Sequence, residues 1–368
     1  MRKKSAGVAA SSKMPAFAGG RPYRLTSAKA LRPMEARQVD DLPGDSFWQF
    51  EPKWDGFRCL ARRDGAQVDL VSKSGKPLAR YFPEIAAYLA KVAPRRFIID
   101  GELCIPAGDS LSFEALQLRL HPAASRIARL AKETPAILVL FDILASENED
   151  LMASPLSERR AALEALFAAL KGERVRLSPF TRSRTEAKQW LGRAGGGMLD
   201  GVVAKDTRGP YEMGERAMLK VKCLRTADCV VGGFRYATDS DQVGSLLLGL
   251  FNDAGELDHV GFTSGIAREK RAALTRKLEK LKGGPGFTGN APGAPSRWST
   301  ERSAAWVPLK HKLIAEVQYD HVTGQRFRHG TRFLRWRPDK APHQCTMDQL
   351  QREARPSNLI RTLFGAEA

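Results

Sequence analysis

The sequence has 368 residues, a formal net charge of +18 and a pI near 9.9. With 43% hydrophobic and 27% charged residues it has the composition of a globular protein, and it is long enough for two domains. No apolar run is long enough to span a bilayer, and none of the five cysteines forms a C-x-x-C pair, which argues against membrane-spanning and disulfide-scaffold proteins. The basic excess favours a nucleic-acid partner, because cationic side chains release counterions from phosphates when they bind. A basic surface that only aids solubility is the alternative.

The first residues have a composition of their own. Met1 to Gly20 are rich in Ala, Ser, Gly and Lys and contain no acid. This pattern predicts a disordered basic arm over residues 1–21. No sustained apolar core follows the charges, so a secretory signal is not indicated, whereas an organellar transit peptide stays open.

A first domain is expected over residues 22–225, where strand and helix patterns mix. Apolar runs predict buried strands, and a stripe of leucines after Ser154-Pro155 predicts a helix that begins with an N-cap and a proline. A second helix is expected to end at a triple glycine. The predicted strands cover residues 97–99, 136–141, 202–204 and 219–221, and the second helix covers 185–194.

A second domain is expected over residues 226–345, followed by a tail at 346–368. Five short alternating or apolar runs indicate strands, and one helix pattern lies among them at 266–281. Five short strands with one helix are typical of a small Greek-key barrel of the OB type. The five runs are 229–234, 246–251, 257–262, 313–319 and 332–336.

The stretch Lys53-Trp54-Asp55-Gly56 is the strongest chemical signal. A lysine amine that loses its proton is a nucleophile, and neighbouring cations or a metal ion favour the loss. In an extended strand, Glu51 and Asp55 lie on the same side as Lys53. The motif alone is weak, since K-x-D-G arises by chance in roughly one chain in ten of this length. A mixed-charge surface strand is the alternative.

Further candidates follow in chain order. Asp100-Gly101-Glu102 ends one apolar strand and Phe141 ends the next. Acids at a strand end can hold a ribose or a metal, and an aromatic there can stack on a base, although a plain turn and a core phenylalanine are alternatives. Asp200-Gly201 begins another strand. Two regions then supply cations, Lys220 with Lys222, and Arg332 to Lys340 with its interleaved aromatics.

In this order, the segments resemble the six collinear motifs of covalent nucleotidyltransferases, the superfamily of DNA ligases, RNA ligases and mRNA capping enzymes. The ending Arg337-Pro338-Asp339-Lys340 is similar to that of ATP-dependent DNA ligases. Together with Phe113 to Gln117 and Leu156 to Arg160, it resembles the small bacterial ligases of repair and end joining. The resemblance covers about residues 22–342. It implies an α+β fold, with a nucleotidyltransferase (ATP-grasp-like adenylation) domain followed by a C-terminal OB-fold barrel.

The resemblance also implies roles for single residues. Lys53 would be the catalytic nucleophile that bonds to AMP, and the metal ligands for Mg²⁺ or Mn²⁺ would be Asp55, Glu102 and Asp200. Glu51 would accept from the adenine amino group, and Phe141 and Val202 would cover the two faces of adenine. The remaining groups would bind ribose, phosphates or the leaving pyrophosphate: Arg58, Lys73, Glu102, Lys220, Lys222, Arg337, Asp339 and Lys340.

Two positions depart from the family pattern. The family usually has glutamate where this chain has Asp200, so the metal ion would sit differently or bind through a water. In Ser72-Lys73-Ser74-Gly75 a lysine replaces the usual arginine, which removes the two-pronged grip on phosphate.

The expected function is therefore an ATP-dependent DNA ligase that seals nicks in double-stranded DNA through lysyl-AMP and DNA-adenylate. We expect a monomer without a membrane partner, located in the bacterial cytoplasm at the nucleoid, with repair or end-joining proteins as possible partners. The alternatives are an RNA ligase or a capping-type nucleotidyltransferase. A non-catalytic OB-fold protein that binds single strands is a weaker alternative, because it has no need of Lys53, Glu102 and Lys220 together.

Overall fold

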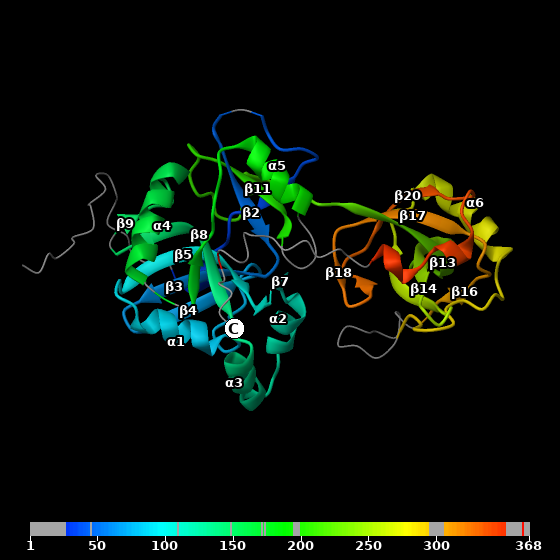
Figure 1. Cartoon of the computed structure of the whole chain (residues 1–368), viewed down its shortest axis with the longest axis horizontal. Helices are drawn as coiled ribbons and strands as arrows, with labels where there is room; N and C mark the ends of the chain where they lie inside the picture. Colours follow the sequence, from blue (N-terminus) through cyan, green and yellow to red (C-terminus); the bar gives the residue numbers. More distant parts are fainter. Residues whose placement is uncertain are drawn as a thin grey trace, which may run out of the picture.

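The chain folds into two lobes (Figure 1). The computed structural model describes residues 27–44, 46–108, 110–147, 149–170, 172, 174–193, 199–293, 305–350 and 363. The N-terminal lobe holds two main sheets and the C-terminal lobe is built around a third, and strand β13 (Arg225–Tyr236) leads from one lobe into the other. The predicted basic arm at 1–21 and most of the predicted tail at 346–368 lie outside the described residues.

The larger sheet of the first lobe has the order β10-β8-β5-β3-β4, with β9 paired to β8. All ten residues of β8 are buried, as a continuous apolar run predicts for a strand that is covered on both faces. Helices α1 (Pro83–Lys91) and α4 (Leu156–Leu170) pack on this sheet and join its core. The strands are β3 (Phe57–Asp64), β4 (Gln67–Ser72), β5 (Arg96–Cys104), β8 (Ile137–Ser146), β9 (Glu149–Asp150) and β10 (Val175–Leu177).

The smaller sheet has the order β1-β12-β11-β2. Helix α5 (Arg184–Arg193) packs on β2 and β11. The strands are β1 (Ala36–Gln38), β2 (Trp48–Trp54), β11 (Leu199–Asp206) and β12 (Met218–Lys222). In the register, Lys53 lies opposite Gly201, and Val203 lies between Glu51 and Lys220. Because side chains alternate along a strand, this register gathers a carboxylate and several lysines on one face of the sheet.

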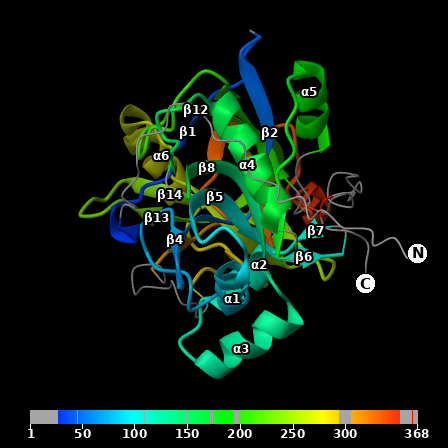
Figure 2. The ribbon, with the colours of Figure 1, turned by 90° about the vertical axis from the view of Figure 1, so that its left-hand side faces the viewer.

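Short elements complete the first lobe. They are η1 (Ala28–Ala30), β6 (Pro106–Ala107), β7 (Ser110–Leu111), α2 (Phe113–Arg119) and α3 (Ala124–Glu133). Helix α2 begins at Ser112, whose hydroxyl accepts a hydrogen bond from Ala115 N at 3.1 Å and caps the helix. Figure 2 shows α3 standing away from the sheets, at the lower edge of the lobe.

The second lobe is a curled sheet with the order β15-β14-β13-β17-β20, to which β16 (Val307–Pro308) adds on β13. A parallel bridge between Thr263 and Thr331 joins the two edges of the sheet, so that it closes toward a barrel. The other elements are β14 (Val243–Phe251), β15 (Leu257–Thr263), α6 (Arg268–Glu279), β17 (Ile314–Tyr319), β20 (Arg332–Trp336), η2 (Pro342–Gln344) and η3 (Met347–Gln349).

A small hairpin extends from the barrel toward the first lobe (Figure 1). It consists of β18 (Val322–Thr323) and β19 (Arg326–Phe327). We call residues 320–329 the docking hairpin, because side chains at both of its ends contact the first lobe.

The predicted strands and helices all occur in the described chain, usually longer than predicted. The sequence did not predict β3, β4, α1 to α3 or the docking hairpin as elements. Within the described residues, every helix is too short or too polar to cross a bilayer.

Candidate active site

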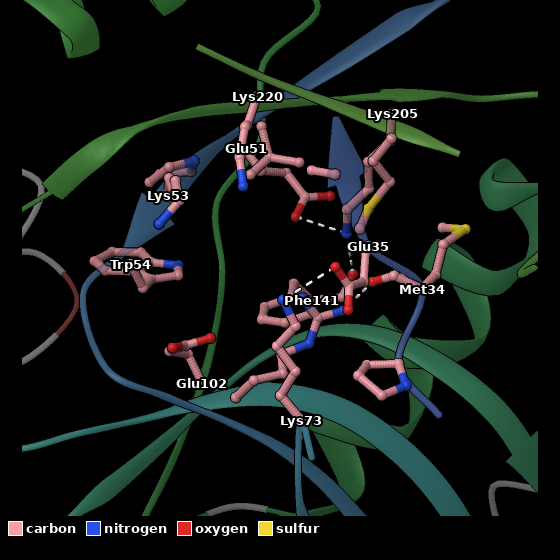
Figure 3. A pocket seen from close by; sticks show the side chains of 16 residues that line it. Met34, Glu35, Glu51, Lys53, Trp54, Lys73, Glu102, Phe141, Lys205 and Lys220 are labelled. Carbon is pink, nitrogen blue, oxygen red and sulfur yellow. Dashed lines mark hydrogen bonds and ion pairs between the residues drawn. The ribbon is translucent and has the colours of Figure 1, made fainter. Parts of the chain in front are cut away.

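A cavity of about 200 Å³ lies between the two sheets of the first lobe. The smaller sheet contributes Glu51 and Lys53 from β2 and Lys220 from β12, while the larger sheet contributes Glu102 and Phe141. Figure 3 shows the ends of the Lys53 and Lys220 side chains near each other, with Glu102 across the cavity. The residues that line the cavity are Pro33, Met34, Glu35, Ala36, Glu51, Pro52, Lys53, Trp54, Arg58, Lys73, Glu102, Phe141, Val203, Lys205, Met218 and Lys220.

Lys53, the predicted nucleophile, has 25% of its side chain exposed and forms an ion pair with Asp200. Lys220 stands near it, on strand β12 of the same sheet. Partial burial and the charges of Lys53, Lys222 and Lys73 lower the pKa of Lys220. A group of lysines in a half-buried cavity favours an anionic ligand, because each unpaired charge costs free energy when it leaves water.

Glu51 is held by two partners at the back of the cavity. Its carboxylate accepts a hydrogen bond from Gln49 at 2.8 Å and forms an ion pair with Lys205 at 2.9 Å. Lys205 also donates to the carbonyl of Phe141 at 3.0 Å and lies 4.8 Å from the centre of its ring. This fixed carboxylate keeps free lone pairs, so it can still accept from a ligand amino group. Lys205, on β11, had no predicted role.

Arg58 is fixed against a buried carboxylate. Its guanidinium donates to both oxygens of Asp100 at 2.6 Å and to Met34 O at 3.1 Å, and it stacks on Phe141 at 4.5 Å. Burial alone would lower the pKa of Arg58, but Asp100 outweighs that effect and raises it. Arg58 therefore presents a permanent positive charge to the cavity, over a ring that is only 8% exposed.

Glu102 and Lys73 lie at other parts of the cavity wall. Burial raises the pKa of Glu102 to about 7, against the opposing charges of Arg58 and Lys53. Lys73 is an exposed residue whose amine lies 3.0 Å from the Glu35 carboxylate. The predicted phosphate contact of Lys73 thus competes with an ion pair in this structure.

The structure corrects the prediction for Val202. This side chain is fully buried in the core that contains Trp54 and Trp190, whereas Val203 lines the cavity. Val203 pairs directly with Glu51, so both side chains lie on the cavity face of the sheet and Val202 lies on the other. Val203, one residue further along the strand, is therefore the apolar side chain that β11 contributes to the cavity wall.

The docking hairpin reaches three of the predicted site residues. Arg328 donates to both oxygens of Asp55 at 2.7 and 2.9 Å, and Asp320 accepts from Lys222 at 2.7 Å. His321 Nε2 lies 2.7 Å from Asp200 Oδ1. No local sequence pattern indicates these partners, because the pairs are separated by 98 to 273 residues.

These contacts change the ionisation of the site. Burial alone would raise the pKa of Asp200, but His321 and Lys53 hold it well below its ordinary value. Burial alone would lower the pKa of Lys222, and Asp200 and Asp320 raise it. Asp200 is therefore an ionised carboxylate that contacts Lys53 from its own lobe and His321 from the docking hairpin.

The predicted metal ligands are not gathered into one group. Among the described residues there is no cluster of three or more His, Cys, Asp or Glu side chains that could hold an ion. Asp55 is paired with Arg328, Asp200 with Lys53 and His321, and Glu102 faces the cavity. The donor chemistry still suits Mg²⁺, which commonly binds through one or two carboxylates together with substrate phosphates.

The predicted pyrophosphate residues lie away from the cavity. Arg337 donates to Asp228 at 2.9 and 3.0 Å, and Lys340 donates to the same carboxylate at 2.8 Å. Asp339 accepts from Arg337 at 2.8 Å. In this arrangement of the lobes the docking hairpin, not this basic cluster, faces the cavity side of the first lobe.

Comparison with known proteins identifies the family. The model of the ATP-dependent DNA ligase domain matches residues 30–222, and the model of the ATP-dependent DNA ligase C-terminal region matches residues 239–340. This chain belongs to the ATP-dependent DNA ligases. The ligase is 43% identical over 335 residues to DNA ligase C2 of Mycolicibacterium smegmatis, with 87% of this chain and 94% of the relative covered. It is 40% identical over 338 residues to DNA ligase C of Mycobacterium tuberculosis, with 88% and 94% covered.

The fold of the ligase agrees with this family. A solved structure of a Lig E DNA ligase matches it with a TM-score of 0.54 at 19% identity, covering 83% of this chain and 100% of that one. The predicted fold class, a nucleotidyltransferase domain followed by an OB-type barrel, is thereby confirmed. The ligase is an enzyme that uses ATP, as the resemblance implied.

Proposed function

We propose that this ligase seals nicks in duplex DNA through a covalent bond between AMP and Lys53. In the first step Lys53 Nζ attacks the α-phosphorus of ATP, a P–N bond forms, and the P–O bond to pyrophosphate breaks. AMP then passes to the 5′-phosphate at a nick and frees the lysine. In the last step the 3′-hydroxyl attacks that phosphate, closes the backbone and releases AMP.

The observation that carries this proposal is the position of Lys53 on the cavity wall, beside Lys220 and across from Glu102. The cavity holds the other groups that the reaction needs. Phe141 and Val203 offer apolar surface for adenine, and Glu51 offers an acceptor for its amino group. Arg58 and Lys220 supply fixed positive charge where phosphate charge develops, so the protein contributes mainly by positioning and electrostatics.

We further propose that Mg²⁺ or Mn²⁺ enters with ATP. Glu102 and Asp200 would hold the ion, while Asp55 is paired with Arg328 only as long as the barrel keeps its present position. When bound, the ion neutralises charge on the phosphates during the displacement. Until it binds, Lys53 forms an ion pair with Asp200, and His321 Nε2 lies 2.7 Å from the same carboxylate.

The barrel has to change its position during the cycle if Arg337 and Lys340 orient pyrophosphate, because both are now paired with Asp228. Residues 222–228, between β12 and the body of β13, are the proposed hinge. Arg337→Ala should therefore slow formation of lysyl-AMP and spare the sealing of a pre-adenylated nick. Arg335→Ala is the matched control, since that side chain is 64% exposed. Equal losses in both reactions for Arg337→Ala would contradict the proposed role.

The decisive experiment is adduct formation. The purified ligase is incubated with ATP labelled in the α-phosphate, and the protein is analysed by mass spectrometry and peptide mapping. AMP is expected on Lys53, absent in Lys53→Ala and retained in Lys91→Ala, an exposed lysine at the end of α1. Label on the Lys53→Ala protein would refute the assignment. Nicked substrates with DNA or RNA strands, offered with ATP or GTP, then test substrate choice.

We propose a role in DNA repair for the sealing reaction, carried out by a monomer at the nucleoid in the bacterial cytoplasm. The similarity to DNA ligases C of mycobacteria supports a bacterial setting. Repair or end-joining proteins as recruiting partners remain part of this proposal.

A further inference from the structure

Tyr211 is a buried tyrosine that the mechanism above does not use. It lies in the connection between β11 and β12, with 5% of its surface exposed. Its ring is not part of the cavity wall. Its hydroxyl nevertheless connects two pieces of that wall that are far apart in the chain.

The hydroxyl of Tyr211 makes two hydrogen bonds. It donates to Asp100 Oδ2 at 2.5 Å and accepts from Met34 N at 3.0 Å. Burial, and next the charge of Asp100, raise the pKa of Tyr211 well above its ordinary value, so the hydroxyl keeps its proton and can donate. The backbone of Tyr211 is itself anchored, because its N–H donates to Met152 O at 2.7 Å.

Both partners of the hydroxyl act on Arg58. Asp100 accepts both prongs of the Arg58 guanidinium at 2.6 Å, and Met34 O accepts from the same group at 3.1 Å. Met34 is thus held at its N–H by Tyr211 and at its carbonyl by Arg58. The four groups form a closed ring of hydrogen bonds behind Phe141, whose ring stacks on Arg58.

The ring of contacts determines the geometry of the cavity. A guanidinium with both prongs on one carboxylate has few other orientations. The carboxylate, however, is oriented only as firmly as its remaining bonds allow, and Tyr211 supplies its third donor. Without the hydroxyl, Asp100 can rotate and the segment that carries Met34 and Glu35 loses its buried acceptor.

We propose that Tyr211 is a positioning residue for adenylation, which fixes Arg58 and the Met34 wall in the orientation that receives the nucleotide. This inference rests on the proposed role of the cavity in binding ATP. It concerns the first step of the reaction most, because that step requires the empty cavity to have the correct shape before ATP enters.

The test compares Tyr211→Phe with Tyr88→Phe. Tyr88 is a half-buried tyrosine of α1 whose hydroxyl donates to Leu170 O at 2.6 Å, so both changes delete one hydroxyl and its hydrogen bond in the same lobe. KM and kcat for lysyl-AMP formation are measured with ATP, together with the sealing of a pre-adenylated nick and thermal unfolding. For Tyr211→Phe we expect kcat/KM for adenylation to fall by roughly tenfold or more, the size of losing one hydrogen bond to a buried charged group. Tyr88→Phe should change kcat/KM less than twofold.

A double-mutant cycle with Arg58→Lys separates positioning from general stability. If Tyr211 acts through Arg58, Tyr211→Phe should cost much less in the Arg58→Lys background than in the wild type. Equal costs in the two backgrounds, or adenylation kinetics equal to those of Tyr88→Phe, would overturn the inference. Failure of the wild type to form lysyl-AMP would instead overturn the proposed function, so the two failures are distinguishable.

Discussion

The glycine that ends the Lys53-Trp54-Asp55-Gly56 motif offers a sharp test of how the site is built. Gly56 lies in the tight connection between β2 and β3, directly against β5. A Cβ atom at this position would lie 2.2 Å from Leu103 O and 2.8 Å from Glu102 Cγ. The chain therefore needs glycine here because of the close approach of a neighbouring strand, which carries one of the cavity carboxylates.

The change Gly56→Ala should consequently act at two levels. The carbonyl of Leu103 belongs to backbone and cannot rotate away, so β5 and the motif have to separate locally. Overpacking of this kind costs about 1 to 3 kcal/mol in the free energy of unfolding. At about 2 to 4 °C per kcal/mol for a lobe of this size, the midpoint of thermal unfolding should fall by several degrees. Because Glu102 moves with β5, formation of lysyl-AMP should fall more than stability alone explains.

Gly44→Ala is the matched control, since a Cβ there would meet nothing within 4 Å. Both variants are compared by calorimetry and by the rate of AMP transfer to the protein at a temperature where both are folded. We expect Gly44→Ala to behave as the wild type in both measurements. If Gly56→Ala unfolds and adenylates like Gly44→Ala, the close approach of the two strands does not shape the site and the reasoning is wrong.

Three further predictions concern the cavity and the hairpin. Val203→Ala should raise KM for ATP about fivefold through lost apolar contact, whereas Val202→Ala should lower stability by about 2 kcal/mol and leave KM unchanged, as measured by adenylation kinetics and thermal unfolding. The raised pKa of Glu102 means that the folded ligase holds this proton more tightly than the unfolded chain does. In the absence of ATP and metal, the contribution of Glu102 to stability is therefore present below its ordinary pKa of 4.5 and is lost as the pH rises to about 7. Denaturant titrations at several pH values should show this loss for the wild type but not for Glu102→Gln. Parallel pH profiles of stability for the two proteins would contradict the prediction. Arg328→Ala should weaken the contact between the lobes by about 3 kcal/mol, because it removes the guanidinium that pairs with the buried Asp55 carboxylate. Arg335→Ala, a change at an exposed position, should cost less than about 1 kcal/mol. Energy transfer between dyes on the two lobes measures the difference, and equal transfer in both variants would count against the prediction.

The sequence predicted those features of the fold and the site that depend on residues close together in the chain. Apolar runs indicated the buried strands, and the side of an extended strand on which Glu51 and Lys53 lie follows from alternation alone. The motif order then placed Arg58, Glu102, Phe141 and Lys220 at one site, and the structure brings all of them to the lining of one cavity.

The remaining features depend on contacts between residues far apart in the sequence, which no local pattern shows. Val203 rather than Val202 faces the cavity because it pairs with Glu51 on the neighbouring strand, which lies about 150 residues earlier in the chain. Tyr211 contributes through partners that are 111 and 177 residues away. Arg328 and His321, which contact Asp55 and Asp200, come from the barrel, so these contacts emerge only when the two lobes are placed together.

Through the docking hairpin, the barrel makes intramolecular contacts with residues of the predicted active site. Asp320 and His321 occupy Lys222 and Asp200 from within the same molecule, where the effective concentration of a linked partner reaches the millimolar range for short flexible connections. A phosphate that binds Lys222, or a cation that binds Asp200, would have to displace Asp320 or His321 from it. Under the proposed roles of Lys222 and Asp200, loading the nucleotide and releasing the barrel would be two sides of one equilibrium.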